Sequence, residues 1–243
     1  MGVAIVTASC AAAAAIFLRL ARTRYQEFHI AISLTRAHFL FQALPTFISQ
    51  LFTYFWSHVD LFHRATQPFV GMYEKSKRAS ESILLDYVSA PPVIIAIKAA
   101  RKSHWKVAYF SLLSLASNVL PTLVGTLFTT ISSGSRVTVT VDIQKLSYVA
   151  AILLVYCISI PIAWPTRNRK LPRNVDSPTD LFCFCYSSQL LDDPALDLSD
   201  PDYKREDFVQ ALHRSNKKYR FGFYQGTDKR KHLGIHLQRE GTG

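Results

Sequence analysis

The sequence predicts an α-helical multipass transmembrane bundle of about four spans with a small soluble C-terminal α+β cap. Three observations predict this fold class. Hydrophobic residues make up 49% of the 243-residue chain. Long uncharged apolar runs alternate with segments in which the charged residues gather. The formal net charge is +11, and basic residues flank the apolar runs, as is typical of the cytosolic loops of membrane proteins.

The first apolar run, residues 3–18, is rich in alanine and is followed by Arg19, Arg22 and Arg24. It is short for a bilayer crossing, which takes about 20 residues. A signal peptide is the alternative, although a signal carries its basic residues before the apolar stretch and not after it. We therefore favour an N-terminal anchor and basic loop over residues 1–37, and a signal role for residues 1–20 stays open.

The second run, residues 39–57, ends in Tyr54, Phe55 and Trp56, where an interfacial aromatic belt would lie. Pro45 inside it predicts a kink, because proline removes an intrahelical donor. The polar side chains of Gln42 and Gln50 predict contacts with other helices of a bundle.

The third run, residues 107–135, contains no charged residue and is bracketed by Lys106 and Arg136. The fourth, residues 146–164, ends before Pro165 and a basic cluster. Residues 38–164 therefore form the predicted membrane domain, with three spans and a cytosolic loop.

That loop contains a predicted interfacial helix over residues 93–102, after two prolines. Three isoleucines would face the lipid and three basic residues the headgroups or solvent: Ile94, Ile95 and Ile97 against Lys98, Arg101 and Lys102. Basic residues in this loop and after the fourth run outnumber those of the other loops, which places both termini in the cytosol by the positive-inside rule.

Residues 165–243 predict a soluble tail with two short helices and a β-hairpin. Ser177-Pro178 and Asp200-Pro201 resemble helix starts, which would run to about residues 191 and 213. Residues 219–224 and 232–237 alternate across a turn and predict the two strands of the hairpin.

The residues point to no cofactor and no metal site. Phosphate-loop, zinc-protease and serine-hydrolase motifs are missing. His58, Asp60 and His63 cluster at the end of the second run, but their spacing does not bring all three to one helix face. Asp192, Asp193 and the Asp200–Asp202 pair fit helix ends better than metal ligands.

The four cysteines predict no disulfide framework. Cys10 and Cys157 lie inside apolar runs and are predicted to be packing residues. Cys183 and Cys185 read first as small residues on a packed segment, with palmitoylation as the alternative. Nucleic-acid binding is disfavoured despite the charge, because no aromatic-and-basic recognition motif occurs.

Several segments resemble a fungal multipass membrane-protein family with a repeated domain of unknown function, DUF3433. They are the run Ser82-Ile-Leu-Leu-Asp86-Tyr87, the run from Lys98 to Ala108 that contains Arg101, His104 and Trp105, and the tail motif Tyr219-Arg-Phe-Gly222-Phe-Tyr-Gln-Gly226 with His232-Leu-Gly234. The motif residues that carry the resemblance, with no role implied, are Ser82, Leu84, Leu85, Asp86, Tyr87, Arg101, His104, Trp105, Gly222, Gly226 and Gly234.

The resemblance implies a single unit or a shortened member, since family members are longer and carry two related units. It implies no reaction. Asp86 lies in an otherwise apolar run and predicts a salt bridge or a helix cap at the membrane surface, with Arg78 or Lys98 as possible partners. His104 and Trp105 predict an interfacial anchor.

The function predicted from these observations is that of a structural or interaction component of a membrane, and not of an enzyme. Its partners would be the lipid bilayer and cytosolic proteins or anionic lipids, reached through the basic loop and the tail. A channel or transporter component is the alternative, and a cavity reaching Gln42, Gln50 and Asn118 would support it. A membrane-embedded enzyme, built where His58, Asp60 and His63 meet the histidines of the tail, is less favoured. The sequence predicts neither the oligomeric state nor the particular membrane.

Overall fold

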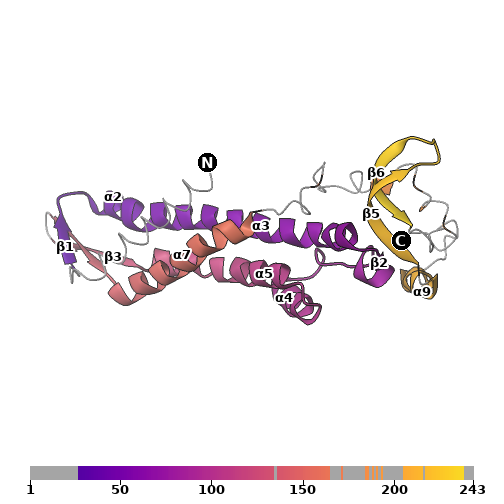
Figure 1. Cartoon of the computed structure of the whole chain (residues 1–243). Helices are drawn as coiled ribbons and strands as arrows, with labels where there is room; N and C mark the ends of the chain where they lie inside the picture. The colour runs from indigo at the N-terminus through magenta and orange to yellow at the C-terminus, as the bar shows by residue number, and fades with distance from the viewer. Residues whose placement is uncertain are drawn as a thin grey trace. The chain divides into compact units, whose positions relative to one another are not determined.

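A computed structural model describes residues 27–133, 136–164, 205–215 and 217–237, with isolated positions between residues 171 and 193. The described chain is mostly helical and contains two small sheets (Figure 1). It divides into two compact units. The first unit takes the chain up to residue 61 and residues 91–164, and the second takes residues 62–90 and the chain from residue 165. The predicted anchor over residues 3–18 lies outside the described residues, as does most of the helix predicted from Ser177.

A long helix opens the first unit in three consecutive parts: α2 (Leu34–His38), the π-helical turn η1 (Phe39–Ala43) and α3 (Leu44–Glu74). The π-helical turn directly precedes Pro45, and such turns accommodate a residue that cannot donate to the α-helical ladder. The helix continues well past residue 57, the predicted end of the second span. The predicted span ended at residue 57 because the apolar run ends there. The helix itself continues, since a charged residue such as Asp60 does not stop a helix.

Three shorter helices follow in the first unit: α4 (Pro92–Arg101), α5 (Trp105–Ser117) and α6 (Leu120–Gly125). Pro92 opens α4 at a position where its missing N–H costs nothing. Ser103, with φ of 59°, makes the left-handed turn into α5. Ile94 and Ile97 of α4 are exposed as predicted, but Ile95 is fully buried. The expectation that Ile95 faces lipid is therefore wrong, because the helix also needs an inner face.

The third predicted span is corrected by the structure. Its helical part ends at Gly125, and the remainder forms β3 (Phe128–Ser133), which pairs antiparallel with β4 (Arg136–Val141). Absence of charge could not separate helix from strand here, although the β-branched Thr129, Thr130 and Ile131 favour a strand. The fourth predicted span matches α7 (Ile143–Ala163).

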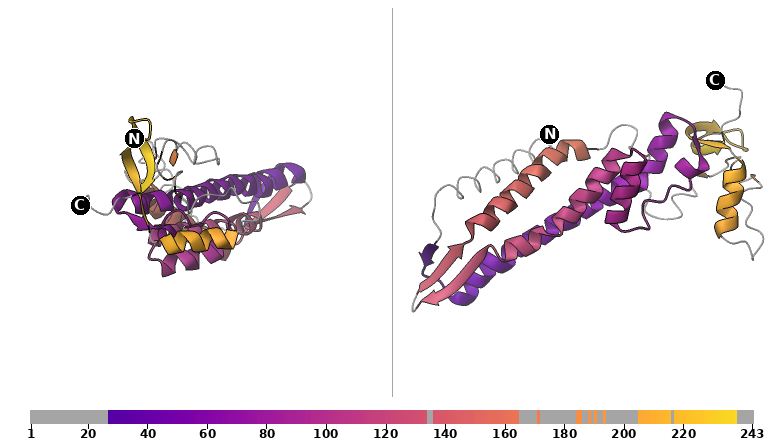
Figure 2. Two further views of the ribbon diagram at one scale, coloured as in Figure 1. Left: turned by 90° about the vertical axis from the view of Figure 1, so that its right-hand side faces the viewer. Right: turned by 90° about the horizontal axis from the view of Figure 1, so that it is seen from below.

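The strand β1 (Glu27–Ile30) completes the sheet of the first unit, in the order β1-β4-β3. Its register sets Ile30 against Val137, which on its other side faces Ser132. Figure 2 shows the β3–β4 hairpin beside the beginning of the long helix, and the amide of Gln42 donates to the carbonyl of Phe128 at 3.0 Å. The chain before α2 and the connection between α6 and α7 thus meet in one sheet.

Aromatic side chains fill the space between the helices α3, α5 and α7. Trp56, Phe110, Leu113 and Tyr156 form a buried cluster. The rings of Trp56 and Phe110 are stacked with centroids 6.3 Å apart, and Tyr156 donates from its hydroxyl to the carbonyl of Leu113 at 2.5 Å.

The second unit contains β2 (Lys77–Arg78), the short 3₁₀ helix η2 (Ala79–Glu81), α9 (Arg205–Ser215), β5 (Lys218–Gln225) and β6 (Lys231–Leu237). Its sheet has the order β2-β5-β6. The strands β5 and β6 occupy the residues for which a hairpin was expected, and α9 covers the latter part of the helix expected from Asp200. Its core consists of Phe69, Met72, Ala79, Phe184, Leu190, Leu212, Tyr219, Phe221 and Ile235.

Among the described residues, two stretches are helical, long and apolar enough to cross a membrane: Trp105–Gly125, which joins α5 and α6, and Ile143–Ala163. The helix over the predicted second span is not one of them. Its glutamine, serine and threonine residues lower its hydropathy. The described chain thus shows two candidate spans, and the prediction of about four spans is not confirmed.

Candidate functional site

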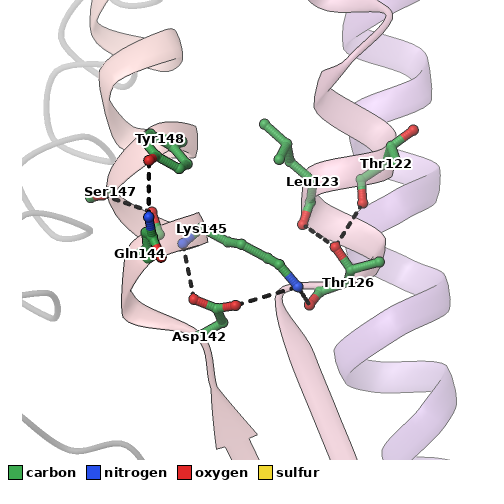
Figure 3. A network of polar contacts seen from close by, with 8 residues as sticks. All are labelled: Thr122, Leu123, Thr126, Asp142, Gln144, Lys145, Ser147 and Tyr148. Carbon is green, nitrogen blue, oxygen red and sulfur yellow. Dashed lines mark hydrogen bonds and ion pairs between the residues drawn. The ribbon is translucent and has the colours of Figure 1, made fainter.

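The two candidate spans meet at a polar junction (Figure 3). Asp142 caps the start of α7, where its Oδ1 accepts from the backbone amide of Lys145 at 3.1 Å. The Nζ of Lys145 lies 3.3 Å from Asp142 Oδ2 and donates to the carbonyl of Thr126 at 3.2 Å. Thr126 is the C-cap of α6. The Asp142–Lys145 pair therefore supplies hydrogen-bond partners both to a backbone carbonyl at the end of one candidate span and to a backbone amide at the beginning of the other. The amide of Lys145 is also the main cause that holds the pKa of the Asp142 carboxyl below its ordinary value.

Hydroxyl and amide side chains extend the junction along both helices. Thr126 donates to the carbonyl of Thr122 at 3.1 Å, and the amide of Gln144 donates to the Tyr148 hydroxyl at 3.1 Å. Tyr148 is exposed. An exposed tyrosine one turn from a helix end, with its polar tip held toward that end, is typical of the water–lipid boundary.

A seam of buried hydroxyls joins α3 to α5 in the first unit. Thr53 donates to the carbonyl of Ser117 at 2.8 Å, Ser57 and Ser114 place their oxygens 3.4 Å apart, and Ser111 donates to Asp60 at 2.7 Å. As the chain ascends on α3 it descends on α5, so the helices are antiparallel. Small hydroxyl residues at such spacing let two helices approach closely, which is how helices associate in membranes.

The seam and the junction are structural features that sequence reasoning missed. A signal for the seam was present, because Ser111, Ser114 and Ser117 recur at intervals of three residues and so share one helix face. The interval from α6 to α7 gave no such signal, since the contact of Lys145 with Thr126 bridges 19 positions of sequence.

The side chains of His58, Asp60 and His63 do not share one face of α3. Asp60 and His63 are buried, whereas His58 is exposed and lies edge-on to Tyr54 with ring centroids 4.3 Å apart. Within the described part of the chain, no group of three or more His, Cys, Asp or Glu side chains is placed to hold a metal ion. The arrangement offers hydrogen bonding and packing.

A shallow groove of about 690 Å³ runs along η1 and the beginning of α3. Gln42 and Gln50 line it. Asn118 does not, because its amide folds back to the carbonyl of Ser114 at 2.9 Å. The cavity that would support a channel is therefore formed only in part.

The first family-like motif, residues 82–87, is a packed turn in the second unit. Ser82 is fully buried and donates to the carbonyl of Arg78 at 2.7 Å. Leu85 and Tyr87 are buried and Leu84 packs against the core. Burial raises the pKa of Tyr87 to about 12. Asp86 accepts from the backbone amides of Val88 and Ser89, each at 3.0 Å, so it caps a turn.

The second family-like motif forms the corner between α4 and α5. Arg101 is the last residue of α4 and is exposed. His104 is half-buried, and its backbone amide donates to the carbonyl of Ala99 at 2.9 Å. Trp105 opens the first candidate span with 67% of its surface exposed, as an interfacial anchor would.

Three glycines of the tail motif have different surroundings. Gly222 and Gly234 face each other across β5 and β6. A Cβ on Gly234 would collide with the carbonyl group of Phe184, whereas one on Gly222 would meet only His236, at an ordinary 3.9 Å. Gly226 closes the hairpin turn, where its amide donates to the carbonyl of Arg230 at 2.9 Å.

Two further sequence assignments can be checked in the described residues. Cys157 is buried and Cys185 half-buried, and burial raises the pKa of the Cys185 thiol. Asp193 was expected at a solvated helix end, and this is wrong. It is buried, and its Oδ1 lies 2.8 Å from the Nζ of Lys217. The opposite charges of these two side chains compensate each other at the edge of the core. Cys10, Cys183, Asp192 and the Asp200–Asp202 pair lie outside the described residues.

Comparison with known proteins gives one family. Residues 39–129 match the family model described as a protein of unknown function, DUF3433. The match includes η1, α3, α4, α5 and α6, and therefore both the seam and the corner motif. A search of curated proteins found no match, and neither did a search of solved structures.

Proposed function

We propose, from the match of residues 39–129 to the DUF3433 family model, that the chain is an integral membrane protein whose first unit crosses the bilayer. Its role is to make protein or lipid contacts, and catalysis has no site among the described residues. The proposal rests above all on one observation: polar side chains are buried and apolar side chains are exposed in the first unit, which is the reverse of a soluble protein.

The first unit buries hydroxyls and exposes hydrocarbon. Ser111, Ser117 and Ser159 are fully buried. On α7, by contrast, Leu154, Val155, Ile158 and Ile162 are exposed, and only 28% of its most apolar 18-residue stretch is buried. A soluble protein rarely leaves so large an apolar surface in water, whereas lipid is the solvent that such a surface requires.

Aromatic residues support the position of the bilayer boundary. Trp105 begins the first candidate span and Trp164 follows the end of the second, and both are exposed. At the opposite end Tyr148 lies beside the Asp142–Lys145 junction. Indole and phenol rings at both ends of an apolar stretch are typical of transmembrane helices.

The sheet of the first unit supports the proposed topology. Pairing of β1 with β4 keeps residues 27–30 on the side of the membrane where the α6–α7 connection lies. The corner between α4 and α5 then lies on the other side. Because that corner carries Lys98, Arg101 and Lys102, we assign it to the cytosol, where it can meet anionic lipids or protein partners.

The test places one charge on the proposed lipid-facing surface. Ile158→Asp should cost about 2.5–3.5 kcal/mol of membrane insertion and reduce the fraction of the chain that resists alkaline extraction from membranes. Phe223→Asp is the matched control, since Phe223 is also a large exposed apolar residue but lies in the proposed soluble tail. If Ile158→Asp is extracted no more than the control, α7 faces water and the proposal fails.

A channel or transporter component is the second candidate. One observation favours it, namely the groove of about 690 Å³ that Gln42 and Gln50 line. We rank it lower because the groove is open to the outside of the unit along its length and Asn118 takes no part in it.

A further inference from the structure

A small pocket lies at the turn end of the sheet in the first unit. Its volume is about 340 Å³, near the lower end of the range for ligand pockets, roughly 300–1,000 Å³. Four polar side chains from separate segments line it: Ser33 before α2, Arg36 on α2, Ser132 on β3 and Arg136 on β4.

The two arginines are anchored by a common apolar cluster. Arg36 precedes Ala37, and Arg136 precedes Val137, and these two neighbours are buried together with Val139. The register adds a second constraint, because Val137 pairs with Ile30 on one side and with Ser132 on the other. The backbones that carry the guanidinium groups are thus fixed by packing and by strand pairing.

The charge of the pocket is uncompensated in the part of the chain that the structure describes. No aspartate or glutamate lines it, and neither Arg36 nor Arg136 takes part in any of the ion pairs of the described residues. Two like charges that share a concavity repel each other, and an anion bound between them removes the repulsion.

We propose that this pocket binds a phosphate group. A guanidinium presents parallel N–H donors that match two phosphate oxygens, and two arginines line this pocket. The hydroxyls of Ser33 and Ser132 supply further donors, and the Ser33 side chain makes no capping hydrogen bond to α2. The lining of the pocket is mostly polar, which suits a charged phosphate group. A lipid headgroup and a soluble phosphate compound share this chemistry, and the inference holds whether or not the first unit spans a bilayer.

The experiment uses the full chain in micelles of a maltoside detergent, which carries no phosphate. Inorganic phosphate is titrated and binding is followed by calorimetry and by ³¹P line broadening. Arg36→Gln and Arg136→Gln should each weaken binding about tenfold or more, and the double variant should abolish it. Arg230→Gln, which removes one positive charge from the exposed hairpin turn of the second unit, should leave it unchanged. Circular dichroism without phosphate verifies that all variants fold.

A second arm separates the two sources of phosphate. If inorganic phosphate does not bind, but phosphatidic acid mixed into the micelles shows a shifted headgroup resonance that both arginine variants abolish, the ligand is a lipid and the inference holds. Saturable binding of inorganic phosphate that depends on both arginines supports a soluble ligand. The inference is overturned if wild type binds neither probe, or if the arginine variants bind as wild type does.

Discussion

Hydroxyl-bearing residues hold the helices of the first unit together at the points where a soluble core would use aliphatic ones. Thr53, Ser57 and Asp60 of α3 each meet a serine of α5. Asp60 is the only carboxylate among these contacts, and it is buried with Ser111 as a donor 2.7 Å away. Loss of a hydrogen bond to a buried polar group costs more than loss of one at the surface, so the Asp60–Ser111 contact should matter strongly in the seam.

Ser111→Ala tests that contact. It removes a donor from a buried carboxylate and should lower the free energy of unfolding by about 1–2 kcal/mol, measured by reversible unfolding of the full chain in detergent micelles. The control is Thr122→Ala, because Thr122 is exposed on α6 and its loss should change the free energy of unfolding by less than about 0.5 kcal/mol. Equal effects of the two substitutions would show that the seam contributes no more than the surface.

Among the secondary-structure elements, the hairpin β5–β6 contains two facing glycines with different surroundings. A Cβ at Gly234 has no room because the backbone of Phe184 lies against it, while the paired Gly222 has room. Glycine within a strand often marks such a close approach of another segment. The packing of the second unit therefore depends on one of two facing glycines far more than on the other.

Gly234→Ala should lower the stability of the second unit by about 3 kcal/mol or more, because the carbonyl of Phe184 must move and backbone cannot yield as a side chain can. Gly222→Ala should be tolerated and is the matched control. Tryptophan fluorescence does not report on this unit, whose described residues include no tryptophan. Hydrogen exchange of the β5 and β6 amides is therefore the measurement. Equal protection in both variants would contradict the account.

Prediction from sequence succeeded where one physical property governed the element. Local sequence alone predicted three elements: the apolar run predicted α7, the prolines predicted the start of α4, and the alternation predicted the strands of the hairpin. The run over residues 107–135 did not, because lack of charge is shared by a transmembrane helix and by a threonine-rich strand. Residues 62–90 were expected in a membrane loop, yet they group with the tail, since the pairing of β2 with β5 joins positions far apart in sequence.

The candidate site was less accessible to sequence reasoning than the fold. Asp86 was expected in a salt bridge or a helix cap, and it accepts hydrogen bonds in a turn. Trp105 is exposed, and its role as an interfacial anchor stays a prediction. The Asp142–Lys145 junction and the Arg36–Arg136 pocket could not, because each depends on how a hairpin brings two segments together. Gly234 was named for its resemblance to the family, but the family match ends at residue 129, and the approach of Phe184 gives a physical reason for a glycine there.

For the whole molecule, we propose that the first unit crosses a bilayer with its sheet and its α4–α5 corner on opposite sides. Two candidate spans of 21 residues each support it, since an α-helix of that length is about 31 Å long and the hydrocarbon core is about 30 Å thick.

The most direct test is labelling with a membrane-impermeant thiol reagent in sealed, right-side-out vesicles. Single cysteines at Arg101 and Ser132, both exposed, are introduced into a chain whose native cysteines are replaced. We predict that the cysteine at position 132 reacts from outside and that the one at position 101 reacts only after permeabilisation. Labelling of position 101 alone would reverse the proposed orientation. Equal labelling of both from outside would contradict the claim that the first unit spans the membrane.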